Sequence, residues 1–150
     1  MNTFKLIGAV ALAGAASACA TLEEGVVEEL SETYYTNLTG AAVVGGGDVD
    51  GSGRAEVSVS DELDQVCYDL NDIRGIGPIT AAHIHRGAAG TNGPPVVTFT
   101  RANEGGYKGC TGASEFIQEF LEGNPNAFYV NVHTAEYPNG AIRGQLTRDD

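Results

Sequence analysis

Apolar and polar residues alternate along several short stretches of the chain, as expected for β-strands that bury one face. In RAEVSVS, Ala55, Val57 and Val59 fall on one side, and the charged and hydroxyl side chains fall on the other. Glycine, proline and asparagine separate such stretches, and these residues favour turns. We therefore predict strands at residues 34–44, 54–60, 65–73, 80–85, 94–100, 127–134 and 141–147.

One stretch, SEFIQEFLEG, has the period of a helix instead. Ser114 is a suitable N-cap, and Gly123 is a suitable stop that Pro125 follows closely. The apolar residues of the stretch share a single stripe, which is typical of packing against a sheet. The pattern predicts one short helix at about residues 114–122.

The composition suits a single all-β domain. Hydrophobic residues make up 42% and charged residues 19% of the chain, which is ordinary for a globular protein. The 21 glycines favour a fold rich in turns. The formal net charge of −12 disfavours contact with phosphate backbones, so we expect no nucleic-acid partner. A bound cation or a cationic partner suits this charge better, although solubility alone also accounts for it.

The N-terminal residues are typical of an export signal. Lys5 precedes an apolar run, Leu6 to Ala18, that is too short to span a bilayer. We assign residues 1–18 to a signal peptide and the glutamate-rich residues 19–32 to an acidic tether. The domain then occupies residues 33–150.

Two processing routes remain open at the end of this signal. The residues ASAC resemble a bacterial lipobox, in which Cys19 is acylated and becomes the new N-terminus. The small residues before Cys19 also suit ordinary cleavage, with release into the periplasm or the medium. We favour lipidation, because it explains a cysteine directly at the cut, and the membrane then becomes a partner through the lipid anchor. In a bacterium with two membranes, Ala20 resembles the pattern that sorts lipoproteins to the outer membrane.

The chain has three cysteines, an odd number for an exported protein. If Cys19 carries lipid, Cys67 and Cys110 remain as a pair that export would place in an oxidising compartment. The alternative is two free thiols. We predict a disulfide between Cys67 and Cys110.

Several long motifs resemble the CHRD domain, which is named after chordin and is common in secreted bacterial proteins. The strongest are TAAHIHRGAAGTNGPPVV, GCTGA and NPNAFYVNVHTAEYPNGAIRGQL, and GGGDVDGSGRAEVSVS and VCYDL also resemble the bacterial form. The resemblance covers about residues 33–148. It implies an all-β Greek-key or immunoglobulin-like β-sandwich, and the animal members resemble modules that bind growth factors outside the cell. We therefore expect a binding or structural module at the extracytoplasmic surface, with an extracytoplasmic protein as a candidate partner.

All three histidines of the chain lie within these motifs. His83 and His85 are two residues apart, so on a strand they share one face while Ile84 points to the other. The same alternation in YVNVHT places His133 on the face opposite its valines. If the two strands are neighbours, three imidazoles meet, and this set suits zinc or copper.

The fourth ligand and the alternative role of the histidines stay open. Water or a carboxylate can occupy the fourth position, and Glu136 and Asp69 are the candidates for the carboxylate. Histidines on a strand also often serve structure, and these could brace the loop at residues 87–93 through their ring N–H groups. Metal binding and loop bracing are therefore competing hypotheses for the same residues.

Catalysis has little support in the sequence. Neither Ser52 nor Ser114 is placed beside a histidine, so no general base or nucleophile is evident. The segment His83–His85 is similar, over a few residues only, to the HxH strand of copper–zinc superoxide dismutases. An enzyme would therefore have to use the metal ion, for example in redox chemistry, and we lean towards a binding protein.

Two further groups carry charge within the motifs. Asp48 and Asp50 in GGGDVDGSG resemble part of a calcium loop, although carboxylates in turns more often accept local backbone hydrogen bonds. Arg86 and Arg143 are expected to hold carboxylates and pin a loop to a strand, in preference to binding an anion.

Overall fold

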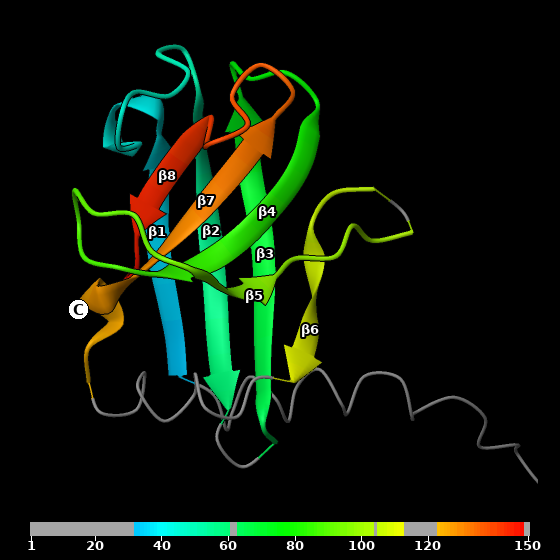
Figure 1. The fold of residues 1–150 in the computed structure, drawn as a ribbon. Helices are drawn as coiled ribbons and strands as arrows, with labels where there is room; N and C mark the ends of the chain where they lie inside the picture. The colour runs from blue at the N-terminus through cyan, green and yellow to red at the C-terminus, as the bar shows by residue number, and fades with distance from the viewer. Residues whose placement is uncertain (1–31, 61–62, 104, 113–122, 149–150) are drawn as a thin grey trace, which may run out of the picture.

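The computed structural model describes residues 32–60, 63–103, 105–112 and 123–148. Its strands and two 3₁₀ turns are shown in Figure 1. They are β1 (Glu32–Thr39), η1 (Gly40–Ala42), β2 (Ser52–Ser60), β3 (Gln65–Arg74), β4 (Ile79–Arg86), β5 (Pro95–Thr98), β6 (Lys108–Gly112), η2 (Pro125–Ala127), β7 (Phe128–Thr134), β8 (Ile142–Gln145) and β9 (Thr147–Arg148).

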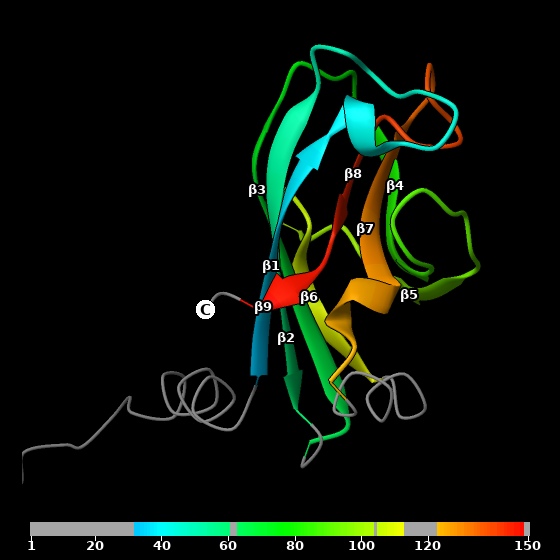
Figure 2. The same cartoon turned by 90° about the vertical axis from the view of Figure 1, so that its left-hand side faces the viewer.

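The strands form two layers that face each other, seen from the side in Figure 2. The hydrogen-bonded order is β5-β4-β7-β8-β1-β2-β3-β6, and β9 pairs with β1. β8 and β1 are paired only between Thr39 and Arg143, so this is the point where the chain of paired strands turns from one layer into the other. The predicted all-β sandwich is confirmed. Among the described residues, no helix is long and apolar enough to cross a membrane.

The core lies between the two layers and is built by the predicted alternation. Ala55, Val57 and Val59 of β2 are at most 2% exposed, and Ile84 of β4 is fully buried. Strand neighbours of these residues point outward, because successive side chains of a strand leave opposite faces of the sheet. Each layer therefore has an inner apolar face and an outer face that is free for polar chemistry.

The structure differs from the predicted strands at three places. The predicted strand at residues 141–147 is divided into β8 and β9, and β9 pairs with β1. β1 ends at Thr39 rather than at residue 44, because the chain turns back through η1. At Gly40 a side chain would collide with the carbonyl of Asp48, which shows how closely the two segments approach. The strand β6 was not predicted, since its sequence KGCTG has little β propensity. The predicted helix at residues 114–122 lies outside the described residues.

A disulfide joins β6 to β3. Cys67 and Cys110 are directly opposite each other in the antiparallel pair, with their Cα atoms 3.9 Å apart. The predicted disulfide is confirmed. Because it closes a loop with a sequence separation of 43, the chain-entropy relation assigns it about 4 kcal/mol of stability. Pairing and cross-linking together hold a strand that its own residues favour only weakly.

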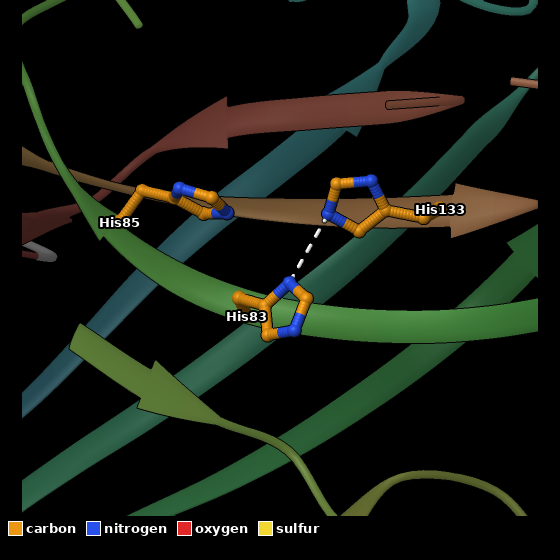
Figure 3. A group of neighbouring side chains, drawn as sticks. All are labelled: His83, His85 and His133. Carbon is orange, nitrogen blue, oxygen red and sulfur yellow. Dashed lines mark hydrogen bonds between the residues drawn. The ribbon is translucent and has the colours of Figure 1, made fainter. Parts of the chain in front are cut away.

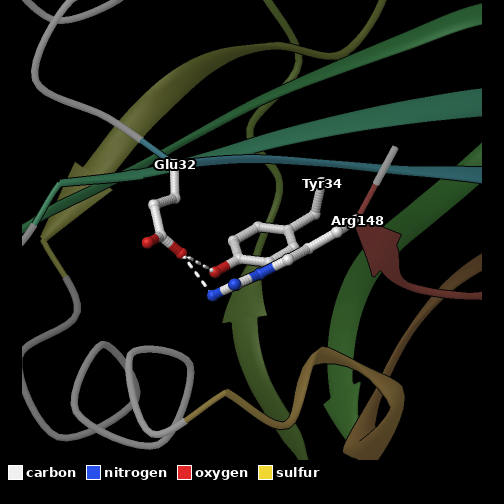
Figure 4. Close-up of polar contacts among 3 residues, drawn as sticks. All are labelled: Glu32, Tyr34 and Arg148. Atoms are coloured by element: carbon white, nitrogen blue, oxygen red, sulfur yellow. Dashed lines mark hydrogen bonds and ion pairs between the residues drawn. The ribbon is translucent and has the colours of Figure 1, made fainter. Parts of the chain in front are cut away.

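The two ends of the described domain are held together by a polar cluster beside the core (Figure 4). Glu32, at the start of β1, accepts a hydrogen bond from the Tyr34 hydroxyl at 2.6 Å and pairs with Arg148 at 2.7 Å. The guanidinium of Arg148 lies 5.8 Å from the centre of the Tyr34 ring. Burial of Tyr34, reinforced by its hydrogen bond to Glu32, raises the pKa of its hydroxyl. This cluster therefore links β9 to the start of β1.

Candidate metal centre

The pairing of β4 with β7 brings the three histidines together. In this antiparallel pair Ala81 is opposite His133, and His83 is opposite Asn131. The alternating residues of both strands, Ile84, Val130 and Val132, are fully buried in the core. The histidines therefore lie on the outer face of the β4–β7 layer, where Figure 3 shows one nitrogen of each ring facing the space between them.

The three rings offer a compact set of nitrogen atoms. One nitrogen from each of His83, His85 and His133 lies within 4.8 Å of the others. The shortest separation, 3.1 Å, joins His83 Nδ1 to His133 Nε2. A tetrahedral zinc ion holds imidazole nitrogens about 3.3–3.4 Å apart, given Zn–N bonds of about 2.0–2.1 Å. Side-chain rotations that draw the rings together by an ångström or so would thus complete such a site.

His85 divides its two nitrogens between two tasks. Its Nδ1–H donates to the carbonyl of Gly93 at 2.9 Å, which fixes the tautomer and leaves Nε2 with a free lone pair. That Nε2 atom is buried and has no hydrogen-bond partner among the described residues. The histidine therefore braces the predicted loop, and it also presents an unpartnered nitrogen to the centre of the cluster.

His133 has the same arrangement on the other side. Its Nδ1–H donates to the carbonyl of Pro138 at 2.9 Å, so its Nε2 is the acceptor that receives the Nδ1–H of His83. Backbone carbonyls bonded to the outer nitrogen are a regular second layer of histidine metal sites, because they orient the ring and raise its basicity. Two of the three rings thus already have the orientation that a metal ion requires.

Two glycines allow the carbonyl-bearing loops to approach the histidines. A side chain at Gly93 would collide with the carbonyl of Arg86, where the loop returns to β4. Gly140 has a φ of 136°, and a side chain there would meet the amide of Asn131. The second loop is the turn at Pro138-Asn139-Gly140, closed by the Gly140 N–H donating to the Tyr137 carbonyl at 3.1 Å.

The electrostatic setting favours neutral imidazoles. Burial, followed by the neighbouring His133 and His85, lowers the pKa of His83. Burial also lowers the pKa of His85, and the hydrogen bond to Gly93 opposes that change only in part. A neutral ring is the form that binds metal ions, so the ligand form of these two histidines is present at neutral pH.

A stack of side chains extends the site beyond the three histidines. The ring of Tyr129 lies parallel to that of His85, with centres 4.9 Å apart, and the Arg143 guanidinium lies 3.4 Å from its centre. The Tyr129 hydroxyl accepts the N–H of Gly93 at 3.1 Å. The position of Tyr129 two and four residues before Asn131 and His133, on the same strand face, is the signal that links it to the site.

Neither proposed carboxylate joins the histidines. Asp69 lies on β3 in the other layer, on the outer face, where it pairs with Lys108 at 3.2 Å. Glu136 is exposed in the β7–β8 loop and is not part of the histidine group. The prediction of a protein carboxylate as fourth ligand is therefore not met by the described residues. The strand at Asp69 was predicted, but the sequence could not tell which layer β3 would join.

The remaining charged residues have structural partners. Asp48 accepts the backbone N–H of Asp50 at 3.2 Å, as in an ordinary turn. Among the described residues, neither aspartate belongs to a group of side chains that could hold a metal ion. Arg143 does pin the glycine-rich loop, but the prediction of a carboxylate partner is wrong. Its guanidinium donates to neutral oxygens, Asn92 Oδ1 at 3.3 Å and the Ala88 carbonyl at 3.2 Å. Arg86 is exposed at the end of β4, and its carboxylate partner stays a prediction.

Fold and site together define a β-sandwich protein with a three-histidine cluster on the outer face of one sheet. The model of the CHRD domain family matches residues 34–146, so the chain belongs to the CHRD family. Membership of this family suggests an extracellular binding module. No curated protein and no solved structure matches the chain.

Proposed function

We propose that this protein is a CHRD binding module of the cell envelope whose histidine cluster binds one copper or zinc ion. The observation that carries the proposal is the buried Nε2 of His85, which has no hydrogen-bond partner among the described residues and faces the other two rings. A buried polar atom without a partner destabilises the fold by about 1–3 kcal/mol, so it calls for a ligand. A metal ion supplies one and also suits the neighbouring nitrogens.

The ligand atoms follow from the hydrogen bonds of the rings. His85 and His133 would bind through Nε2, because their Nδ1–H groups are held by the carbonyls of Gly93 and Pro138. His83 would bind through Nδ1, after its ring changes to the tautomer that carries the proton on Nε2. Three neutral imidazoles suit both zinc and copper, and the copper ion binds such sites more tightly. Water or a partner's ligand would occupy the fourth position.

The test is a titration of the purified, metal-free protein with Cu²⁺ or Zn²⁺ in competition with a chromophoric chelator. We expect one ion per chain. His83→Gln, His85→Gln and His133→Gln should each weaken binding by about a hundredfold or more, since loss of a ligand exceeds the 10–100-fold cost of losing a supporting residue. Asp48→Asn is the matched control, because it removes a charge outside the cluster.

Thermal unfolding of each variant separates loss of the ligand from loss of the fold. Binding well below one ion per chain would overturn the proposal. So would a folded His85→Gln variant that binds as tightly as the parent protein.

We also propose that Cys19 carries the lipid that holds the module at the membrane. The disulfide uses the other two of the three cysteines, so Cys19 is the one left for acylation. The mature protein would then stand off the membrane on the acidic tether of residues 19–32. Labelling of cells with an alkyne fatty acid should mark the parent protein and leave Cys19→Ser unmarked. An unlabelled parent protein found in the soluble fraction would favour ordinary signal cleavage.

A further inference from the structure

Arg143 is a buried cation whose charge no carboxylate balances among the described residues. The residue is only 2% exposed. A guanidinium has five N–H donors, and the described partners use two of them, both on neutral oxygens. Burial lowers the pKa of Arg143, but a guanidinium stays charged at neutral pH. The fold thus retains a positive charge and unused donors at a defined place.

That place is the wall of an open pocket of about 350 Å³. The pocket lies between the segment around η1 and the glycine-rich loop after β4. Besides Arg143 and Gln145 it is lined by small aliphatic residues and a glycine, namely Ala41, Ala42, Val43, Val44, Ala89 and Gly90. It is therefore apolar with a single charged group, the usual composition of a small-molecule site.

The other polar group of the wall has fewer donors to spare. The amide nitrogen of Gln145 donates to the carbonyls of Gly87 at 2.7 Å and Asn126 at 2.6 Å. None of the lining residues is acidic, so nothing in the wall competes for the guanidinium. The pocket accordingly has one group for an anion and an apolar surface for the rest of the ligand.

We propose that this pocket binds a small aliphatic carboxylate, with the carboxylate on Arg143 and a short branched body against the alanines and valines. A guanidinium suits a carboxylate because its planar fork donates two parallel hydrogen bonds. The aliphatic wall selects against inorganic anions, which offer nothing to bury there. The site is distinct from the histidine cluster, since it lies on the opposite side of the Tyr129 ring from His85 in the β4-β7-β8 order.

The affinity should be modest. A ligand of this size makes few contacts, and the net charge of −12 opposes the approach of any anion. We expect a dissociation constant on the order of 1 mM, which efficient small ligands reach. Added salt should not weaken binding appreciably, because it screens the repulsion between the acidic protein and the anion, whereas the buried charge of Arg143 is screened little.

The experiment is a titration of the metal-free protein with isovalerate, followed by the backbone amide signals in nuclear magnetic resonance. The protein must be freed of chelator first, because carboxylate chelators would compete for Arg143. We expect saturable shifts confined to the residues around Ala42, Val44, Ala89 and Gly90. Isovaleramide, which has the same shape without the charge, should bind at least tenfold more weakly than isovalerate.

Two variants test the pocket in different ways. Arg143→Met removes the charge, and Ala89→Phe fills the mouth from an exposed position while Arg143 stays in place. Both should abolish saturation, whereas Arg148→Met, which changes the other arginine that stacks on a tyrosine, should leave it intact. If Arg143→Met fails to fold, Ala89→Phe alone decides.

Three outcomes would overturn the proposal. The first is a set of amide shifts that rise linearly with isovalerate concentration and do not saturate. The second is binding of isovaleramide as tight as that of isovalerate, and the third is undiminished isovalerate binding by folded Ala89→Phe. Because the titration uses no metal ion, these outcomes are independent of whether the histidines bind one.

Discussion

Two arginines of this protein lie over tyrosine rings, and they differ above all in their hydrogen-bond partners. Arg148 stacks on Tyr34 and also pairs with the carboxylate of Glu32 (Figure 4). Arg143 stacks on Tyr129, more closely, but meets only neutral oxygens among the described residues. The same stacked pair of residue types therefore has a carboxylate partner at Arg148 and has none among the described residues at Arg143.

The difference teaches where this fold can accept a ligand. The Glu32 cluster is satisfied internally and joins the two ends of the domain, so it has a structural role. The Arg143 stack lies between a pocket and the histidine cluster, where the buried Nε2 of His85 has no partner among the described residues, and Arg143 itself has donors that its described partners leave unused. Unsatisfied polar groups are costly in a stable fold, and they concentrate where a ligand completes them.

The largest expected effect is the difference in the free energy of unfolding between variants that lack one or the other guanidinium. Arg143→Met should lower the free energy of unfolding by about 2 kcal/mol, because it removes a buried cation–π contact and leaves loop oxygens without their donor. Arg148→Met should lower it by less than about 1 kcal/mol, since the side chain of Arg148 is 48% exposed and its ion pair is solvated. Urea unfolding measures both. Equal losses would mean that the two stacks have the same role.

A smaller effect on the free energy of unfolding is expected from adding a carboxylate at Arg143 and removing the one at Arg148. Asn92→Asp places a carboxylate on Arg143 and should raise the free energy of unfolding by about 0.5–1 kcal/mol, as charge-assisted hydrogen bonds exceed neutral ones. It should also abolish isovalerate binding, because the guanidinium is then paired. Asn103→Asp is the control, since it adds the same charge in an exposed loop. Glu32→Gln should do the reverse at the other stack, with a loss below about 1 kcal/mol. A destabilised Asn92→Asp variant would contradict the interpretation that the charge of Arg143 is not balanced by a carboxylate.

The smallest expected effect is an opposite dependence on pH. The pKa values of His83 and His85 are lowered from 6.5, so their contribution is present above pH 6.5 and is lost as the pH falls. The pKa of Tyr34 is raised from 10.0, so its contribution is present below pH 10.0 and is lost as the pH rises. Thermal unfolding across this range should show both limbs. The double variant His83→Gln/His85→Gln should flatten the acid limb alone, and Tyr34→Phe the alkaline limb alone. Unchanged limbs in these variants would assign them to other groups.

Much of the fold was open to prediction, because strand alternation and turn residues are local signals. The buried faces of β2 and β4 followed from the alternation of neighbouring residues. The Cys67–Cys110 disulfide followed from the cysteine count and the export signal. β6 was missed since its stability comes from pairing and the disulfide, which are not local. The early end of β1 was missed because the approach of Gly40 to Asp48 is a contact between distant segments.

By itself, the sequence determined that His83 and His85 share a face and that His133 faces away from its neighbouring valines. Only the tertiary structure decided that β4 and β7 are neighbours, which brings the three rings together. It also placed Asp69 in the opposite layer and gave Arg143 neutral partners in place of the expected carboxylate. The physical reason is the same in each case: alternation along a strand is decided within a few residues, whereas strand order and loop closure depend on burial of the whole core.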